Sequence, residues 1–315
     1  MSADIAVISP NPLRVQSPIE RVFRGPPDLH YVEFPSSQPT LLLLHGAARD
    51  GRDWQPLLPE LLDEWHVVIL DFRGHGESGR ASGAYLVSDY ARDAVAFVRG
   101  TFSAPITVMG HSLGAMVALN LAAECAPLVE RVVLEDPPFH TMGDRIGSTP
   151  YRAQFAGMRE VALRGGNIAE LTDTLADIRI PTLQGMKRFG DIRDHASLQS
   201  SAEFLMRVDP ELFVPLAAGR WLDGFDHAAL WHRVVCPTLL LQGDPTAGGA
   251  FADEDVEAAR RGLRVYRHRQ FPGVGHQIHR TVPAEVASAL REFSQTQFAE
   301  TTPAPASGTV REVGG

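Results

Sequence analysis

Several features are scarce in this chain, and each scarcity argues against a class of protein. Only two cysteines, Cys125 and Cys236, occur in 315 residues, and both stand in apolar surroundings, so we expect small core residues rather than a disulfide framework. No apolar run approaches the ~20 residues of a membrane span. The N-terminus lacks the basic start and apolar block of a signal peptide. We therefore expect a cytoplasmic protein without a membrane partner.

Basic residues are also scarce. Lysine and arginine total 29 against 38 acidic residues, and the resulting net charge of −9 argues against a nucleic-acid partner. No group of cysteines and histidines has zinc-ligand spacing, and no glycine-rich loop has a phosphate-binding context, so we expect no metal and no cofactor. An apolar content of 44% and a charged content of 21% are ordinary for a globular protein.

The most informative stretch, residues 110–114, has the pattern G-x-S-x-G. The apolar residues 105–109 before it indicate a buried strand, and residues 115–123 after it indicate a helix packed close to a sheet. A serine on such a sharp turn has its hydroxyl pushed out from the sheet edge, and the turn needs glycine at its flanks. This context makes Ser112 a candidate nucleophile, whereas the pattern alone would fit an ordinary glycine-rich turn.

Upstream, the apolar run 40–44 is typical of a central parallel strand, and His45, Gly46 and Ala47 follow it. A serine that attacks a carbonyl needs two N–H donors where the carbonyl oxygen becomes negative. We assign these donors to the backbone of Ala47 and of Leu113, the residue after the candidate nucleophile. We expect His45 to order its loop by hydrogen bonding rather than to carry protons.

The candidate base lies near the other end of the chain. Residues 265–271 indicate a strand, and the glycine-containing loop after it carries His276. A serine hydroxyl is a poor nucleophile until a base takes its proton, and histidine titrates in the right range. We therefore predict His276 as the base, with His279, three residues further along, as its local rival.

Two aspartates are candidates for the acid that would orient this histidine. Asp244 directly follows the apolar strand pattern at 236–243, and Asp136 directly follows the strand pattern at 131–135. An Asp-Pro pair after a strand also fits plain turn chemistry. We favour Asp244 as the acid and keep Asp136 as the alternative.

Strand and helix patterns alternate from residue 40 onward, which predicts a parallel sheet with helices on both faces. The alternation stops after Asp136 and resumes at Cys236. An insertion there, after the sixth strand, would cover the carboxyl ends of the strands, where ligands bind in open parallel sheets. The predicted organisation is a loose N-terminal segment (1–18), a core in two parts (19–137 and 231–298), a helical cap (138–230) and a disordered tail (299–315).

Together these features resemble the α/β-hydrolase fold, in particular its cap-containing serine esterases and lactonases. The order serine, acid, histidine along the chain is the order of that fold. The resemblance implies a mostly parallel sheet of eight strands, with helices on both faces and a helical cap after strand 6. It rests on His45-Gly46, residues 71–78 (DFRGHGES), residues 110–114 (GHSLG), the Asp244 region and residues 273–276 (GVGH).

The resemblance also carries an implied activity. Members of the family often carry the acid three residues after the strand-ending glycine, where this chain has Thr246. Members that use aspartate as the nucleophile do not fit, because position 112 is serine. We expect a serine hydrolase that cleaves a small or medium, apolar carboxylic ester or lactone through an acyl-enzyme. The alternatives are a C–C, amide or carbamate hydrolase or a lyase with the same residues, and a non-catalytic ligand-binding receptor.

Overall fold

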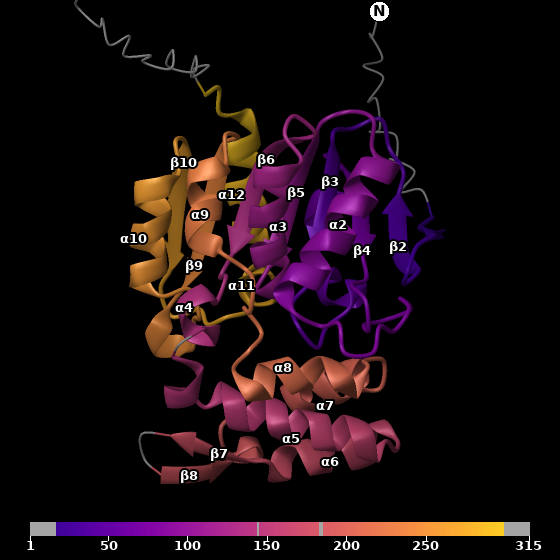
Figure 1. The fold of residues 1–315 in the computed structure, drawn as a ribbon, viewed down its shortest axis with the longest axis vertical. Coiled ribbons are helices and arrows are strands. Elements are labelled where there is room, and N and C mark those ends of the chain that lie inside the picture. Colours follow the sequence, from indigo (N-terminus) through magenta and orange to yellow (C-terminus); the bar gives the residue numbers. More distant parts are fainter. Residues whose placement is uncertain (1–16, 144, 183–184, 299–315) are drawn as a thin grey trace, which may run out of the picture.

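The computed structural model describes residues 17–143, 145–182 and 185–298 (Figure 1). The predicted tail and nearly all of the predicted N-terminal segment lie outside these residues. Eight strands form one sheet in the spatial order β1-β2-β4-β3-β5-β6-β9-β10. Their bounds are β1 (Ile19–Phe23), β2 (Leu29–Phe34), β3 (Thr40–Leu44), β4 (His66–Leu70), β5 (Ile106–His111), β6 (Val129–Glu135), β9 (Thr238–Gly243) and β10 (Tyr266–Phe271).

The sheet is mostly parallel. β1 and β2 form an antiparallel hairpin at one edge, and β2 pairs antiparallel with β4. Every other pairing of this sheet, from β4 across to β10, is parallel. The carboxyl ends of β3, β5, β6, β9 and β10 therefore meet along one edge, and the loops after them converge there. The predicted fold class is confirmed.

Both faces of the sheet are covered by helices, which explains the continuous apolar runs in the strands. Leu42 and Leu44 pack into one apolar cluster, and Leu41 and Leu43 into the other. The first cluster includes residues of α2 (Val87–Thr101), α3 (Leu113–Glu124), α9 (His227–Arg233) and α10 (Asp253–Gly262). The second includes residues of α11 (Ile278–Thr281) and α12 (Pro283–Gln295), and of α1 (Leu58–Leu61), which follows the 3-10 helix η1 (Gly51–Trp54).

Between β6 and α9 the chain leaves the sheet, and we call the elements from α4 to α8 the inserted segment. Figure 1 shows most of it as a layer beyond one end of the sheet. Its buried Phe213 belongs to the same apolar cluster as the helices on the first face, so the two parts share a core. The segment comprises α4 (Phe139–Met142), η2 (Ile146–Ser148), α5 (Tyr151–Arg164), α6 (Ile168–Asp177), β7 (Arg179–Thr182), β8 (Gly185–Arg188), η3 (Phe189–Asp191), α7 (His195–Leu205), η4 (Pro210–Leu212) and α8 (Phe213–Ala218).

One element of the inserted segment is missing from the sequence analysis. β7 and β8 pair as an antiparallel hairpin, apart from the main sheet. Each strand has four residues, and of the four in β7 only Ile180 is buried, so no period-two pattern marks them. Cys125 and Cys236 are buried and free, and no described helix combines the length and apolar character needed to cross a bilayer.

Candidate active site

Ser112 lies on a sharp turn between the end of β5 and the start of α3, with φ at +55°. This left-handed conformation is uncommon for serine and persists only where the surroundings impose it. The two glycines that flank Ser112 show how closely the surrounding backbone packs against this turn. A Cβ at Gly110 would lie 2.0 Å from the carbonyl oxygen of Gly114, and a Cβ at Gly114 would lie 2.0 Å from that of Leu44. The strand–turn–helix context expected of a nucleophilic serine is present.

His276 lies in the loop after β10, and its ring contacts a carboxylate that follows the carboxyl end of β6. Its Nδ1 is 2.6 Å from Oδ2 of Asp136, a fully buried residue just after β6. The same carboxylate accepts hydrogen bonds from the backbone N–H groups of Gly243, Ala250 and Phe251, at 2.9, 2.7 and 3.2 Å. These donors stabilise the ionised carboxylate and fix its direction, so the imidazole is held in one orientation.

Asp244, the acid that the sequence analysis favours, is held elsewhere. Its Oδ2 accepts the N–H of Gly273 at 2.8 Å, and its Oδ1 accepts the N–H and hydroxyl of Thr246 at 2.8 and 2.7 Å. The bond from Gly273, followed by those from Thr246, lowers the pKa of this carboxyl. These hydrogen bonds favour Asp136 over Asp244 as the acid beside His276. Turn chemistry uses the carboxylate of Asp244, and the one beside His276 belongs to Asp136.

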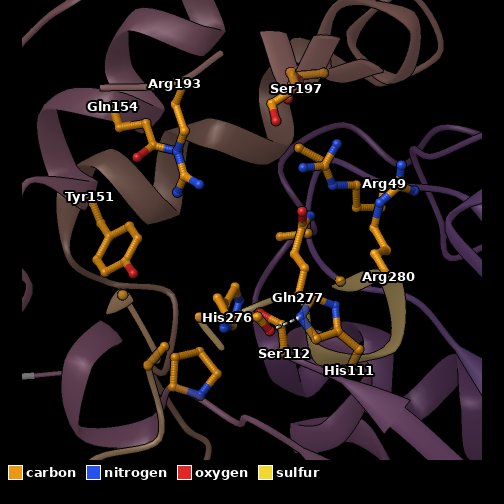
Figure 2. Close-up of a pocket in the computed structure, with 18 of the residues that line it drawn as sticks. Arg49, His111, Ser112, Tyr151, Gln154, Arg193, Ser197, His276, Gln277 and Arg280 are labelled. Atoms are coloured by element: carbon orange, nitrogen blue, oxygen red, sulfur yellow. Dashed lines mark hydrogen bonds between the residues drawn. The ribbon is translucent and has the colours of Figure 1, made fainter. Parts of the chain in front are cut away.

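The residue before Ser112 joins the serine turn to the histidine loop. The Nε2 of His111 lies 3.0 Å from the carbonyl oxygen of His276, and the two ring centroids are 4.6 Å apart. Burial lowers the pKa of His111 well below its ordinary range, so this ring is neutral and donates the hydrogen bond from Nε2. Ser112 and His276 line the same cavity (Figure 2), so the fold unites the predicted nucleophile and base.

His279, the rival base, is buried in a cluster of charged groups and is not among the residues that line this cavity. Oε1 of Glu135 accepts both its N–H, at 3.0 Å, and its Nδ1–H, at 2.8 Å. Its Nε2 lies 3.4 Å from Oδ2 of Asp53, whose Oδ1 accepts from Arg280 at 2.9 Å. Burial opposes the charged ring, but the two carboxylates raise the pKa of His279 to about 9. A buried imidazolium has no free lone pair with which to take a proton.

Two further histidines order the loop after β3. Nδ1 of His45 lies 2.8 Å from the carbonyl oxygen of Gly46, and its Nε2 accepts the N–H of Phe72 at 3.0 Å. The expected loop-ordering role of His45 is thus confirmed. His75 accepts the N–H of Ala48 at 3.1 Å, and burial lowers the pKa of His75 to about 3, which keeps its lone pair available.

The two predicted backbone donors lie next to the serine turn. Ala47 lines the cavity, and Leu113 is the first residue of α3, where N–H groups have no partner within the helix. Across residues 17–298, apart from the gaps already given, the N–H groups of Ala47 and Leu113 bond to no acceptor. Both donors are therefore available for a ligand.

The cavity has a volume of about 480 Å³ and lies between the inserted segment and the carboxyl ends of the strands. In Figure 2, Tyr151, Gln154 and Arg193 stand on one side, Arg49 and Arg280 on the other, and Ser112 with His276 lies below them. No sequence motif predicts these arginines. They come from loops and short helices without periodicity, so no motif marks them.

The charged cluster behind the serine turn also has the composition of a metal site. Asp53, His111 and His279 are buried, and each offers one ligand atom within 4.8 Å of the others. Two arginines already flank Asp53, however, with Arg280 at 2.9 Å and Arg49 at 3.9 Å. Because His279 is cationic as well, the positive charges around this carboxylate disfavour a further cation. We assign the cluster to ion pairing.

The ion pairs of His279 predict a pH-dependent contribution to stability. The pKa in the folded state, about 9, lies above the ordinary 6.5, so this contribution is complete below pH 6.5 and is lost as the pH rises through 9. Its size is about 3 kcal/mol by the linkage relation. Urea unfolding between pH 6 and 10 should therefore show a larger loss of stability in the wild type than in His279→Gln. His232→Gln, at an exposed histidine, should keep the wild-type profile. Parallel profiles for His279→Gln and wild type would contradict the assignment.

The chain is similar to known hydrolases over most of its length. The family model described as "Alpha/beta hydrolase family" matches residues 41–289. An (E)-2-((N-methylformamido)methylene)succinate hydrolase of Acinetobacter baylyi is 22% identical over 269 residues, covering 85% of this chain and 94% of that one. Lipase LipV of Mycobacterium tuberculosis is 24% identical over 270 residues, covering 84% and 97%.

The solved structures show the same architecture. The enol-lactonase of Burkholderia xenovorans superposes with a TM-score of 0.65 at 18% identity, covering 86% of this chain and 97% of that one. At this identity the likeness concerns the fold. Together with the family match and the sheet described above, it establishes that this chain belongs to the α/β-hydrolase family.

Proposed function

We propose that this protein is a serine hydrolase that cleaves a small carboxylic ester or amide through an acyl-enzyme. Ser112 is the nucleophile, His276 the general base and Asp136 the acid that orients it. The observation that carries the proposal is the 2.6 Å bond between the His276 ring and the buried Asp136, beside a serine held at φ +55°. A catalytic triad is recognised by the roles and geometry of its residues rather than by their order in the sequence, and the buried Asp136 beside the His276 ring supports assigning these roles here.

The proposed reaction has two steps. Nδ1–H of His276 donates to Asp136, so the lone pair on Nε2 is free to take the hydroxyl proton as Ser112 attacks the substrate carbonyl. The imidazolium then protonates the leaving alcohol or amine, and the acyl group stays on the serine oxygen. In the second step a water molecule loses a proton to His276, attacks the acyl carbon and releases the acid, and the proton returns to Ser112.

The negative oxygen of each tetrahedral intermediate needs donors. We assign this role to the unpartnered N–H groups of Ala47 and Leu113. The fixed backbone after β3 and at the start of α3 supplies them without rearrangement, and each such donor is worth roughly 10²–10³ in kcat. The inserted segment acts as a cap that limits access of water and large substrates to the cavity.

Both ester and amide bonds fit this arrangement. The relatives named above are called a lipase in one case and a hydrolase of an N-methylformamido compound in another, which supports keeping the amide as a second candidate bond. Matched aryl esters and anilides of one acid would separate the two reactions. A cytoplasmic location and a small-molecule substrate remain predictions of the sequence, and a binding protein without turnover is the weaker alternative.

Removing the nucleophile tests the proposal. Ser112→Ala should lower kcat by roughly 10⁶, the scale seen when the nucleophile of a triad is lost. The measurement is hydrolysis of a panel of p-nitrophenyl esters, with Ser288→Ala, a half-buried serine of α12 that does not line the cavity, as the control. Wild-type rates in Ser112→Ala, or a wild type that hydrolyses no ester and no anilide, would contradict the proposal.

A second prediction separates the two candidate acids. Asp136→Asn should lower kcat by roughly 10⁴, because the amide no longer stabilises the imidazolium or its tautomer. Asp244→Asn should stay within about threefold of the wild type, since this carboxylate bonds only to its own turn and to Gly273. Thermal unfolding of both variants checks that the fold is retained. A large loss in Asp244→Asn together with a small loss in Asp136→Asn would reverse the assignment.

A further inference from the structure

The cavity beside Ser112 has an unusual charge for this protein. The chain is acidic overall, with 38 aspartates and glutamates against 29 basic residues. Yet among the described residues that line the cavity there are three arginines and no aspartate or glutamate. A concave site with one sign of charge raises the local concentration of ligands of the opposite sign. The apolar substrate expected from the sequence does not account for this lining.

Two of the arginines come from the part of the chain that forms the main sheet and its helices. Nearby carboxylates neutralise their charge only in part. Arg280 pairs with Asp53 at 2.9 Å, whereas the Arg49 guanidinium lies 3.9 Å from the same carboxylate. Asp53 is in addition 3.4 Å from the cationic His279. Arg49 also donates to the side-chain oxygen of Gln277, at 2.8 and 3.2 Å, when the amide of Gln277 is assigned with its oxygen facing Arg49. His279 is also paired with Glu135, so two buried carboxylates serve three cations, and the floor of the cavity carries surplus positive charge.

The third arginine, Arg193, comes from the inserted segment, between η3 and α7. No hydrogen bond or ion pair in the described part of the chain involves its guanidinium, in contrast to Arg188, whose guanidinium is bound by Asp177. Figure 2 shows Arg193 directed into the cavity next to Gln154 and Tyr151 of α5. The hydroxyl of Tyr151 bonds to no acceptor among the described residues, and the Gln154 amide has only a 3.8 Å contact with the sulfur of Met158.

Tyr151, Gln154 and Arg193 thus offer a hydroxyl, an amide N–H and a guanidinium on one wall. Such a set of hydrogen-bond donors around a cation is suited to binding a carboxylate. A planar guanidinium can bind the two carboxylate oxygens in bidentate fashion. Ser112 and His276 lie on the same cavity surface. A carboxylate held by this wall would belong to the molecule whose carbonyl faces the serine.

We propose that the substrate carries a carboxylate group, which Arg193 binds together with Tyr151 and Gln154 while Arg49 and Arg280 supply a positive field. The proposal rests on the serine hydrolase function proposed above and narrows its substrate class to small acids that bear an ester or amide and a separate carboxylate. The charge of the substrate contributes to its recognition, so an ester of the same shape without the carboxylate should be a poor substrate.

The test compares two p-nitrophenyl esters of matched shape, the monoester of glutaric acid and the ester of 5-methylhexanoic acid, in which an isopropyl group replaces the carboxylate. The rate in buffer alone is subtracted from each. We expect the wild type to have a kcat/KM at least tenfold higher for the anionic ester. Arg193→Gln should lower that ratio by roughly 10–100-fold, mainly through KM, because the lost contact is made in the ground state as well. Arg193→Lys should recover part of the ratio.

Arg188→Gln is the control, since it removes another arginine of the inserted segment, from outside the cavity, with the same change in net charge. It should leave the ratio unchanged. Equal rates of the wild type on both esters would overturn the carboxylate proposal and leave the hydrolase standing. So would an Arg193→Gln variant that loses activity equally on both. If neither ester is turned over, the panel of esters and anilides described above decides the proposed function, and calorimetry with free glutarate decides the carboxylate site. We expect the wild type to bind glutarate and Arg193→Gln not to bind it, and a wild type that does not bind glutarate would refute the site.

Discussion

The hydrogen bonds between the end of β6 and the segment from His276 to His279 are the constraint on which the site depends. Glu135 and Asp136 are consecutive and buried, and the first holds His279 while the second holds His276. Two bonds to residues three apart fix both the position and the rotation of the short segment between them. His111, one residue before Ser112, adds a bond to the His276 carbonyl. The serine turn and the histidine loop are thereby held as one unit across the sheet edge.

This arrangement places several charges in the protein interior, where each is costly unless it is paired. The carboxylate of Asp136 is stabilised by backbone N–H groups, and that of Glu135 by the His279 imidazolium. Asp53 serves two arginines as well as His279, which leaves positive charge facing the cavity. The network that holds the histidine loop therefore also sets the sign of the charge that faces the cavity. On our proposal, the ion pairs that position the histidine loop also favour an anionic substrate.

The sequence predicted what depends on local pattern. Apolar strands, glycines around Ser112 and the alternation of elements indicated the sheet and the serine turn, because these follow from backbone geometry and burial. The order of the two candidate acids could not be derived from the sequence, for a physical reason. Asp136 and Asp244 both follow apolar strands and precede proline, and only the fold shows that Gly243, Ala250 and Phe251 turn their N–H groups toward Asp136. The sequence signal that could have pointed to Asp136 was Gly243, since a Cβ added at this position would lie 3.2 Å from the Asp136 carboxylate. The arginines of the cavity had no signal, since they meet only through tertiary contacts.

We propose that Ser112 is an activated nucleophile, which its neighbours prepare before any substrate arrives. The most direct measurement is mass spectrometry of the protein after reaction with a fluorophosphonate, which forms a covalent adduct with an activated serine. We expect a single adduct, on the peptide that carries Ser112, with hydrolytic activity lost in proportion to labelling. An adduct on a different serine, or full activity in protein labelled at Ser112, would contradict it.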